Sequence, residues 1–275
     1  MNFPKISVVT PSYNQGKYLE QTILSVLSQD YPNVEYIIID GGSTDGSVEI
    51  IKKYQHRLHY WESEKDKGFG HALNKGFAKA TGEILCWLNS DDILLPGALD
   101  IVGRFFGKFP DVGVVTGDRW YIDESSVMLF KTRYYFYLPG QFKFTKTLAQ
   151  EATFWRKEVF SKAGGYIDEQ LRFVIDFDLW CRLGKVTTFR HIPFFLGGFR
   201  VQPESKSSTI IDVGREERKK TIAKYYDKYP SEFSLSVFLF LLTNLRRLYR
   251  ICGLENLKVL FYKKVLNTGR TADGF

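Results

Sequence analysis

The stretch Val34-Glu35-Tyr36-Ile37-Ile38-Ile39-Asp40-Gly41-Gly42-Ser43-Thr44-Asp45-Gly46 joins an apolar run to a glycine-rich turn. It predicts a buried strand over residues 34–40, and Ser43 or Thr44 can cap the helix that we expect to follow, through Tyr54. The same alternation extends outward, with strand-like runs at 6–10, 59–62 and 83–88, a helical face of Leu19, Ile23, Val26 and Leu27, and a helical segment at 71–80. This order predicts an α/β fold with a mostly parallel central sheet and helices on both faces.

The later elements are less regular. Pro96 suits the first turn of a helix over 97–109, and a strand is expected at 113–117. Residues 119–144 are rich in aromatic side chains and weakly periodic, so we expect a variable loop or hairpin there. The remaining expected elements are a helix at 157–163, a turn at 164–166, a helix starting near Asp176 and a strand at 189–192.

Polar residues follow the expected strands where each one ends. Ligands of open α/β sheets collect at the carboxyl ends of the strands, so these side chains are expected to share one crevice. They are Thr10, Ser12 and Asn14 after the first strand, Asp40 after the second, Asp66 and Lys67 after the third, and Asn89 to Asp92 after the fourth.

Two adjacent carboxylates, Asp91 and Asp92, close the fourth strand. Acidic groups at the end of an apolar strand need compensation by a cation or by hydrogen-bond donors. One carboxylate can hold Mg²⁺ or Mn²⁺ while the other accepts hydrogen bonds from a sugar hydroxyl. The alternative is that one of them caps the helix after Pro96.

Composition limits the class of protein. The 275 residues are 44% hydrophobic, which is enough for one large domain with a substantial core. The three cysteines, Cys86, Cys181 and Cys252, are far apart and form no metal or disulfide motif, so we expect a reduced, cytoplasmic setting and no export.

The net charge of +7 is concentrated near the end, where residues 233–275 hold seven basic residues against two acidic ones. This charge lies beside an uncharged apolar run at 233–245, which is too short to span a bilayer. We expect helices over 233–266 that lie on an anionic membrane surface, at the inner face of the cell membrane, and no nucleic-acid partner. The alternative is that they pack on the catalytic domain or on a second subunit.

The ordered motifs resemble those of the family 2 glycosyltransferases of bacterial surface polysaccharide synthesis. The resemblance covers roughly residues 4–205 and is carried by the segments Val9 to Asn14, Asp40 to Gly46, Asp66-Lys67-Gly68 with Asn74-Lys75-Gly76, and Leu88 to Asp92. It implies the Rossmann-like A-type glycosyltransferase fold, with a nucleotide-binding half at 1–118 and an acceptor half at 119–210. These belong to a catalytic domain over 1–230, followed by a basic helical tail at 231–275.

The resemblance also implies roles for these residues. The nucleotide-sugar, expected to be UDP-linked, would meet Thr10, Pro11, Ser12, Tyr13, Asn14, Asp40, Asp66, Lys67 and Asp91. Asp40 would accept the imide N–H of the base, Asp91 would contact ribose or metal, and Asp92 would be the principal ligand of the Mn²⁺ or Mg²⁺ cofactor. Lys67 could face the diphosphate, and His71 stands where many relatives carry Asp.

A general base must take the proton of the attacking hydroxyl. The family usually shows a Glu-Asp pair before a Leu-Trp helix, and this chain has Ile175-Asp176, so Asp176 is the expected base. The other candidates are Asp168, Glu169 and Asp178, of which Asp178 is expected to serve the helix N-terminus. One direct displacement would invert the anomeric configuration.

On the acceptor side, a saccharide or lipid-linked acceptor would meet Glu151 or Trp155, with core packing as the alternative for Trp155. Arg200 is expected on a flexible stretch that could close over the diphosphate. Gln202 stands where relatives often have a histidine, so a metal-ligand role is not expected there.

Two other functions compete with this one. A nucleotidyltransferase would need a glycine-rich phosphate loop after the first strand, where this chain has Pro11 to Asn14. A non-catalytic module that binds nucleotide-sugars or carbohydrates is favoured only by the departure at Ile175. The release of nucleoside diphosphate would separate an enzyme from such a module.

Overall fold

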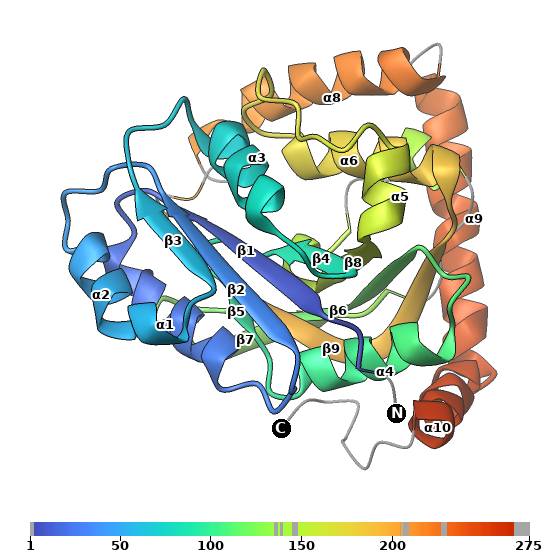
Figure 1. The fold of residues 1–275 in the computed structure, drawn as a ribbon. Helices are drawn as coiled ribbons and strands as arrows, with labels where there is room; N and C mark the ends of the chain where they lie inside the picture. The colour runs from blue at the N-terminus through green and yellow to red at the C-terminus, as the bar shows by residue number, and fades with distance from the viewer. Residues whose placement is uncertain are drawn as a thin grey trace.

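The computed structural model describes residues 3–134, 137, 140–144, 148–203, 205, 209–226 and 230–266. Within these residues nine strands form one sheet, and helices cover both of its faces (Figure 1). The α/β architecture expected from the alternating segments is therefore confirmed.

The strands run in the order β3-β2-β1-β4-β8-β6-β9-β5, and β7 pairs with β6. They are β1 (Ile6–Ser12), β2 (Val34–Asp40), β3 (Tyr60–Ser63), β4 (Ile84–Trp87), β5 (Ile93–Leu94), β6 (Val114–Ile122), β7 (Met128–Thr132), β8 (Thr153–Arg156) and β9 (Phe189–Arg200). The first four strands are parallel, as expected. Antiparallel pairing enters with β8, β7 and β5, so the second half of the sheet is mixed.

The helices follow the expected order along the chain. They are α1 (Gly16–Leu27), α2 (Ser47–Tyr54), α3 (Phe69–Lys79), α4 (Ala98–Lys108), α5 (Lys157–Lys162), α6 (Ile175–Val186), α8 (Ile211–Tyr226), α9 (Glu232–Ile251) and α10 (Leu254–Leu266), with 3-10 turns η1 (Gln55–Arg57), η2 (Gln141–Lys143) and η3 (Gln150–Ala152). Figure 1 shows α3, α5, α6 and α8 above the sheet and α4 below it.

The start of α2 differs from the expectation. The N-cap residue is Gly46, in the left-handed conformation and without a side-chain hydrogen bond, rather than Ser43 or Thr44. Ser43 is used differently, since its hydroxyl donates to Asp40 and accepts the backbone N–H of Asn14. The capping prediction was wrong because these polar groups tie two loops together instead.

The start of α4 also differs. Its N-cap is Gly97, with no side-chain cap, so neither Asp91 nor Asp92 caps this helix. Pro96 lies before the helix rather than in its first turn. The helix-capping explanation of the Asp pair is therefore wrong.

Three tryptophans pack α6 against the centre of the sheet. Trp87 of β4 stacks on Trp180 of α6 with ring centroids 5.9 Å apart, and Trp155 of β8 packs edge-on against both at 5.6 Å. All three are buried. Trp155 is therefore a core residue, and its expected contact with an acceptor sugar is corrected to the packing alternative.

The tail forms two helices that pack on the domain. In α10, Lys258 reaches His191 of β9 at 2.9 Å and Glu255 pairs with Arg133 at 2.8 Å. None of the helices in the described part of the chain is long and apolar enough to cross a membrane. Residues 267–275 of the expected tail lie outside the described residues.

Candidate active site

The loops after β1 and β2 are joined by hydrogen bonds. The backbone N–H of Gly41 donates to the carbonyl of Ser12 at 2.8 Å. Asn14 accepts the N–H of Thr44 through Oδ1 at 2.9 Å, and its own N–H donates to the Ser43 hydroxyl at 2.8 Å. Asn14 has a φ of +51°, a conformation that asparagine tolerates better than most residues. The expected convergence of these two strand ends is confirmed.

Asp40 is buried at the end of β2, and neighbouring groups donate four hydrogen bonds to its carboxylate. Oδ2 accepts from the N–H groups of Gly42 and Ser43 and from the Ser63 hydroxyl, and Oδ1 accepts from the Ser43 hydroxyl. These bonds shape the glycine-rich turn and link it to β3. In this arrangement Asp40 holds the glycine-rich turn at the end of β2.

Beside this turn, Tyr13 and Asp66 approach Gly41. A Cβ on Gly41 would lie 2.8 Å from Asp66 Oδ2 and 3.3 Å from Tyr13 Cδ2. Tyr13 is 62% exposed, whereas Asp66 is half-buried and accepts the N–H of Gly68 at 2.7 Å. A flat ring and a carboxylate therefore flank a backbone that has no side chain of its own.

Other residues expected at the nucleotide differ in how open they are. Thr10 and Pro11 are buried, and the Thr10 hydroxyl lies 3.1 Å from the Tyr36 hydroxyl between β1 and β2. Lys67 is exposed, and its N–H lies 3.4 Å from Nδ1 of His71. The structure thus turns Thr10 toward the core and leaves Lys67 at the surface.

The two carboxylates of the Asp pair have different surroundings. Asp92 is 1% exposed, and its oxygens accept from the backbone N–H of Arg200 at 2.9 Å and from Asn89 Nδ2 at 3.0 Å. Burial, followed by the charges of Asp91 and Glu151, raises the pKa of Asp92 well above its usual value. Asp91 is half-buried and accepts a hydrogen bond from Gln202 Nε2 at 2.6 Å.

Arg200 is the last residue of β9, and its side chain is buried. Its guanidinium donates to the carbonyls of Asp91, Asp123 and Glu124 and to the side chains of Gln21 and Ser126, at 2.6 to 3.0 Å. The expected position on a flexible stretch was wrong, because these five oxygen acceptors hold the residue within the sheet edge. Arg200 thereby connects the Asp91 loop to the β6–β7 hairpin.

Glu151, in η3, forms a buried ion pair that the sequence did not reveal. Arg119 Nη2 of β6 lies 2.8 Å from Glu151 Oε2, and the two side chains are 9% and 0% exposed. Among the described residues, no hydrogen-bond donor reaches Glu151 Oε1. Burial is the largest effect on the pKa of Glu151, which is raised, and the charge of Asp176 adds to the rise.

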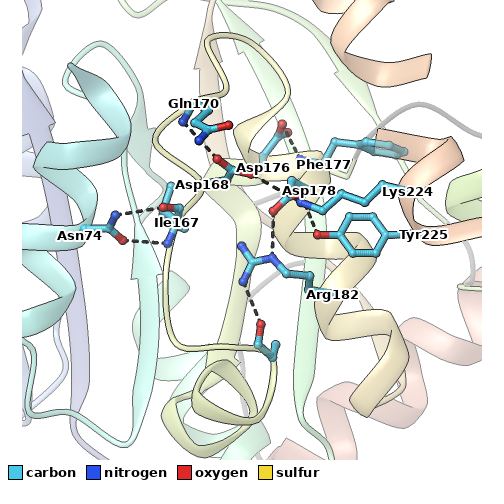
Figure 2. Close-up of polar contacts among 11 residues, drawn as sticks. Asn74, Ile167, Asp168, Gln170, Asp176, Phe177, Asp178, Arg182, Lys224 and Tyr225 are labelled. Carbon is cyan, nitrogen blue, oxygen red and sulfur yellow. Dashed lines mark hydrogen bonds and ion pairs between the residues drawn. The ribbon is translucent and has the colours of Figure 1, made fainter. Parts of the chain in front are cut away.

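Asp176 lies in the first turn of α6 and is half-buried. Its Oδ1 accepts the N–H of Phe177 at 2.7 Å (Figure 2). Asp178, two residues on, is 1% exposed and bonds Arg182 and Tyr225 at 2.8 Å each. Asp178 lies in the first turn of α6, as expected for an acid at a helix N-terminus, and its carboxylate also pairs with side chains of α6 and α8.

The loop before α6 is fastened to α3 by Asn74. The Asn74 amide donates to the carbonyl of Ile167 and accepts its N–H, at 2.9 and 2.7 Å (Figure 2), and it also donates to Glu169. Asp168 accepts the N–H of Gln170 and lies 3.5 Å from Lys224. Glu169 and Asp168 thus support this loop, through the Asn74 amide and Lys224 respectively, while Asp176 lies beyond it in the first turn of α6.

The described residues hold no cluster of three or more His, Cys, Asp or Glu side chains suited to a metal ion. Asp91 offers a carboxylate that is open in part, with the Gln202 amide beside it. Hard divalent cations often bind one or two protein carboxylates and take their remaining ligands from substrate phosphates. The residues at Asp91 therefore fit a metal that arrives with a diphosphate.

Solved structures share this fold. The chain resembles Staphylococcus aureus TarS 1-349 in complex with UDP-GlcNAc, with a TM-score of 0.64 and 17% identity over 81% of this chain and 71% of that one. It also resembles the mannosyltransferase PcManGT of Pyrobaculum calidifontis, in complex with GDP-Man and Mn²⁺, with a TM-score of 0.58 and 15% identity over 97% and 87% of the two chains. At these identities the likeness establishes the fold alone.

Sequence comparisons go further. An uncharacterised glycosyltransferase of Rickettsia typhi is 29% identical over 67% of this chain and 60% of its own length. Glycosyltransferase GlyG of Streptococcus pneumoniae is 36% identical over 50% of this chain and 44% of its own. The chain thus spans about half the length of the curated relatives it matches. The model of glycosyl transferase family 2 matches residues 7–164, more than half of the chain, and the protein therefore belongs to that family.

Proposed function

We propose that the protein transfers a sugar from a nucleotide-diphosphate donor, UDP-linked, to an acceptor hydroxyl in polysaccharide or glycolipid synthesis, with inversion at the anomeric carbon. The observation that carries the proposal is the series of carboxylates along the crevice. The charges of Asp91 and Glu151 raise the pKa of Asp92, and the charge of Asp176 raises that of Glu151, so the strand-end acids and the acid of α6 are close enough to interact. Family membership and the fold support this reading.

The donor base is proposed to lie against Tyr13. The exposed ring suits stacking, and the Asp66 carboxylate next to Gly41 can accept the imide N–H of uracil. We assign this contact to Asp66 in preference to Asp40, whose oxygens already accept four hydrogen bonds. Asn14 and Lys67 are exposed on the neighbouring loops, whereas Ser12 is buried. The solved complex of TarS with UDP-GlcNAc favours a uridine donor.

The metal is proposed to bind at Asp91 rather than Asp92. Asp92 is 1% exposed and each of its oxygens already accepts a hydrogen bond, from the Arg200 backbone and from Asn89, so a metal bound to a diphosphate has readier access to the half-buried Asp91. When bound, a divalent ion would offset the charge that grows on the leaving diphosphate. Arg200 fixes the carbonyl of Asp91 at 2.7 Å and so orients the carboxylate that holds the ion.

Asp176 is proposed as the general base. It would accept the proton of the acceptor hydroxyl as that oxygen attacks from the side opposite the diphosphate. Its neighbour Phe177 orients the carboxylate through its backbone N–H. The rigid Trp87–Trp180 stack fixes the first turns of α6 relative to β4 and therefore fixes the base relative to Asp91.

The test is Asp176→Asn, with release of nucleoside diphosphate from a panel of nucleotide-sugars measured with and without Mn²⁺. We expect transfer to fall at least a hundredfold while UDP binding, measured by calorimetry, stays unchanged, since general-base catalysis contributes about 10²–10⁴ in rate. Asp168→Asn is the matched control, a neighbouring half-buried acid that supports the loop. Full activity of Asp176→Asn would exclude this residue as the base.

A peripheral membrane contact is proposed for the tail. One side of α9 and α10 packs on the domain, and the apolar residues of the other side are between 41% and 69% exposed, namely Val237, Phe240, Leu241, Leu248, Ile251, Leu254, Leu257, Leu260 and Phe261. Arg247, Arg250 and Lys264 are exposed among them. Apolar side chains flanked by cations suit the surface of an anionic bilayer.

Flotation with phosphatidylglycerol vesicles tests this contact. The double variant Phe240→Asp/Arg247→Glu should lose binding, whereas the charge change Lys219→Glu on exposed α8 should have little effect. Circular dichroism would verify that both variants fold. Equal flotation of the Phe240→Asp/Arg247→Glu variant and the unaltered chain would exclude these helices as the membrane contact.

A further inference from the structure

Three aromatic rings form a row across β7, β6 and β9. Tyr121 of β6 stacks on Phe130 of β7, with centroids 4.3 Å apart and planes at 18°, and meets Phe199 of β9 edge-on at 5.6 Å. The register explains the row, because Tyr121 is paired with Phe130 on one side and with Phe199 on the other. Phe130 remains 54% exposed although Tyr121 covers one face of its ring.

The row lies on the same face of the sheet as the buried ion pair. The Arg119 guanidinium is 5.6 Å from the centroid of the Tyr121 ring and 5.1 Å from that of Phe199, while it binds Glu151 at 2.8 Å. The opposite face carries other groups, since Lys131 contacts Trp120 and Phe195 there. Arg119 therefore links the rings to Glu151, whose pKa the charge of the proposed base Asp176 raises.

The row is also connected, through hydrogen bonds of Arg200, to the loop that carries Asp91, the proposed metal ligand. Phe199 precedes Arg200, whose backbone N–H donates to Asp92 and whose guanidinium donates to the Asp91 carbonyl. The same guanidinium holds the carbonyls of Asp123 and Glu124, at the turn between β6 and β7. One side chain thus fixes the distance between the aromatic row and the proposed donor site.

We propose that Phe130, Tyr121 and Phe199 form the platform on which a pyranose ring of a saccharide acceptor stacks. A pyranose offers an apolar C–H face and a rim of hydroxyls, and the platform offers exposed ring surface beside charged groups. The Arg119 guanidinium lies 5.6 and 5.1 Å from the centroids of the Tyr121 and Phe199 rings, and a charged group beside the rings suits the hydroxyl rim of a sugar better than an acyl chain. This inference rests on the proposed function, because the acceptor hydroxyl must reach Asp176.

Saturation-transfer NMR tests the platform with methyl β-glucoside, N,N'-diacetylchitobiose and octyl β-glucoside as probes, in the presence of UDP and Mn²⁺. When aromatic protons of the protein are irradiated, saturation should pass to the ring protons of the bound pyranose. The Phe130→Ala variant should bind the same probe about tenfold more weakly, since an aromatic stacking partner and its buried area are lost. Leu129→Ala is the matched control: it shortens the adjacent apolar residue, which is 50% exposed and has no ring, and its probe binding should be unchanged.

The outcomes separate this inference from the proposed function. Absence of transfer to every probe, equal transfer in Phe130→Ala, or transfer to the octyl protons of octyl β-glucoside alone would overturn the platform. UDP binding measured on the same samples reports the donor site independently. A chain that binds glycosides through Phe130 but releases no nucleoside diphosphate from any donor would keep the platform and refute the transferase.

Discussion

Replacing Arg119 by methionine tests the electrostatics of the acceptor side. The substitution keeps most of the apolar stem but removes the guanidinium that pairs with Glu151 at 2.8 Å, in a site where the two side chains are 9% and 0% exposed. Removing one partner of such a pair costs about 3–5 kcal/mol, because the other charge stays buried without compensation. The nearby charges of Asp92 and Asp176 add repulsion.

The pH dependence gives this prediction its sign. Burial already raises the pKa of Glu151 above its ordinary value, and loss of Arg119 should raise it further. A carboxyl whose pKa is higher in the folded state contributes stability at low pH that is lost as the pH rises through the folded pKa. Arg119→Met should therefore cost about 3–5 kcal/mol at pH 8 and less at pH 5, because the raised pKa of Glu151 makes its protonation easier at the lower pH.

Urea denaturation followed by tryptophan fluorescence measures this loss at both pH values, and at pH 8 the melting temperature should fall by about 10 °C. Adding Glu151→Gln should restore most of the stability at pH 8, since no charge is then buried. Two results would refute the reasoning: an equal loss at pH 5 and pH 8, or no recovery in the double variant.

Three further predictions concern the donor loop, the tail and the core. Gly41→Ala should displace Asp66, whose Oδ2 would lie 2.8 Å from the new Cβ, and should weaken UDP binding by about tenfold in calorimetry with little change in melting temperature. An unchanged affinity for UDP would show that Asp66 does not contact the base. Burial lowers the pKa of Lys258 to about 8, so the free energy of unfolding should rise by about 2 kcal/mol between pH 7.5 and 9.5. Lys258→Met should abolish this rise in urea titrations, and a variant whose unfolding free energy rises equally with pH would contradict the prediction. Trp155→Ala should cost about 3–5 kcal/mol of unfolding free energy, and a loss below about 1 kcal/mol would show that the tryptophan cluster is not tightly packed.

Regular patterns accounted for the first half of the fold. The apolar run at 34–40 became β2 with the same bounds, because a strand buried in a parallel sheet needs apolar side chains on both faces. β8 went unpredicted, since Thr153–Arg156 has only four residues and no alternation to distinguish it. The strand expected at 189–192 extends to Arg200 because β6 supplies a long pairing partner, which is a tertiary effect.

The candidate site divides in the same way. The order of the motifs predicted that the acids at the strand ends lie close together. The hydrogen bond between the loops of Asn14 and Ser43 confirms this convergence for two of the strand ends. The same motifs carried no information on burial. Asp92 and Trp155 were expected at ligands, and both are enclosed, because burial depends on elements distant in sequence, such as β9 and α6.

By itself, the sequence determined the alternation of strands and helices, the family, and the types of residue at the strand ends, since these follow from local periodicity and motif order. Only the tertiary structure decided which of two adjacent aspartates is open, which arginine neutralises Glu151, and which rings line the acceptor side. Each of these depends on pairing between β6, β9 and η3, which lie far apart along the chain. The physical reason is that charge and exposure are set by the neighbours of a side chain in space, and chain order specifies those neighbours only through the complete fold.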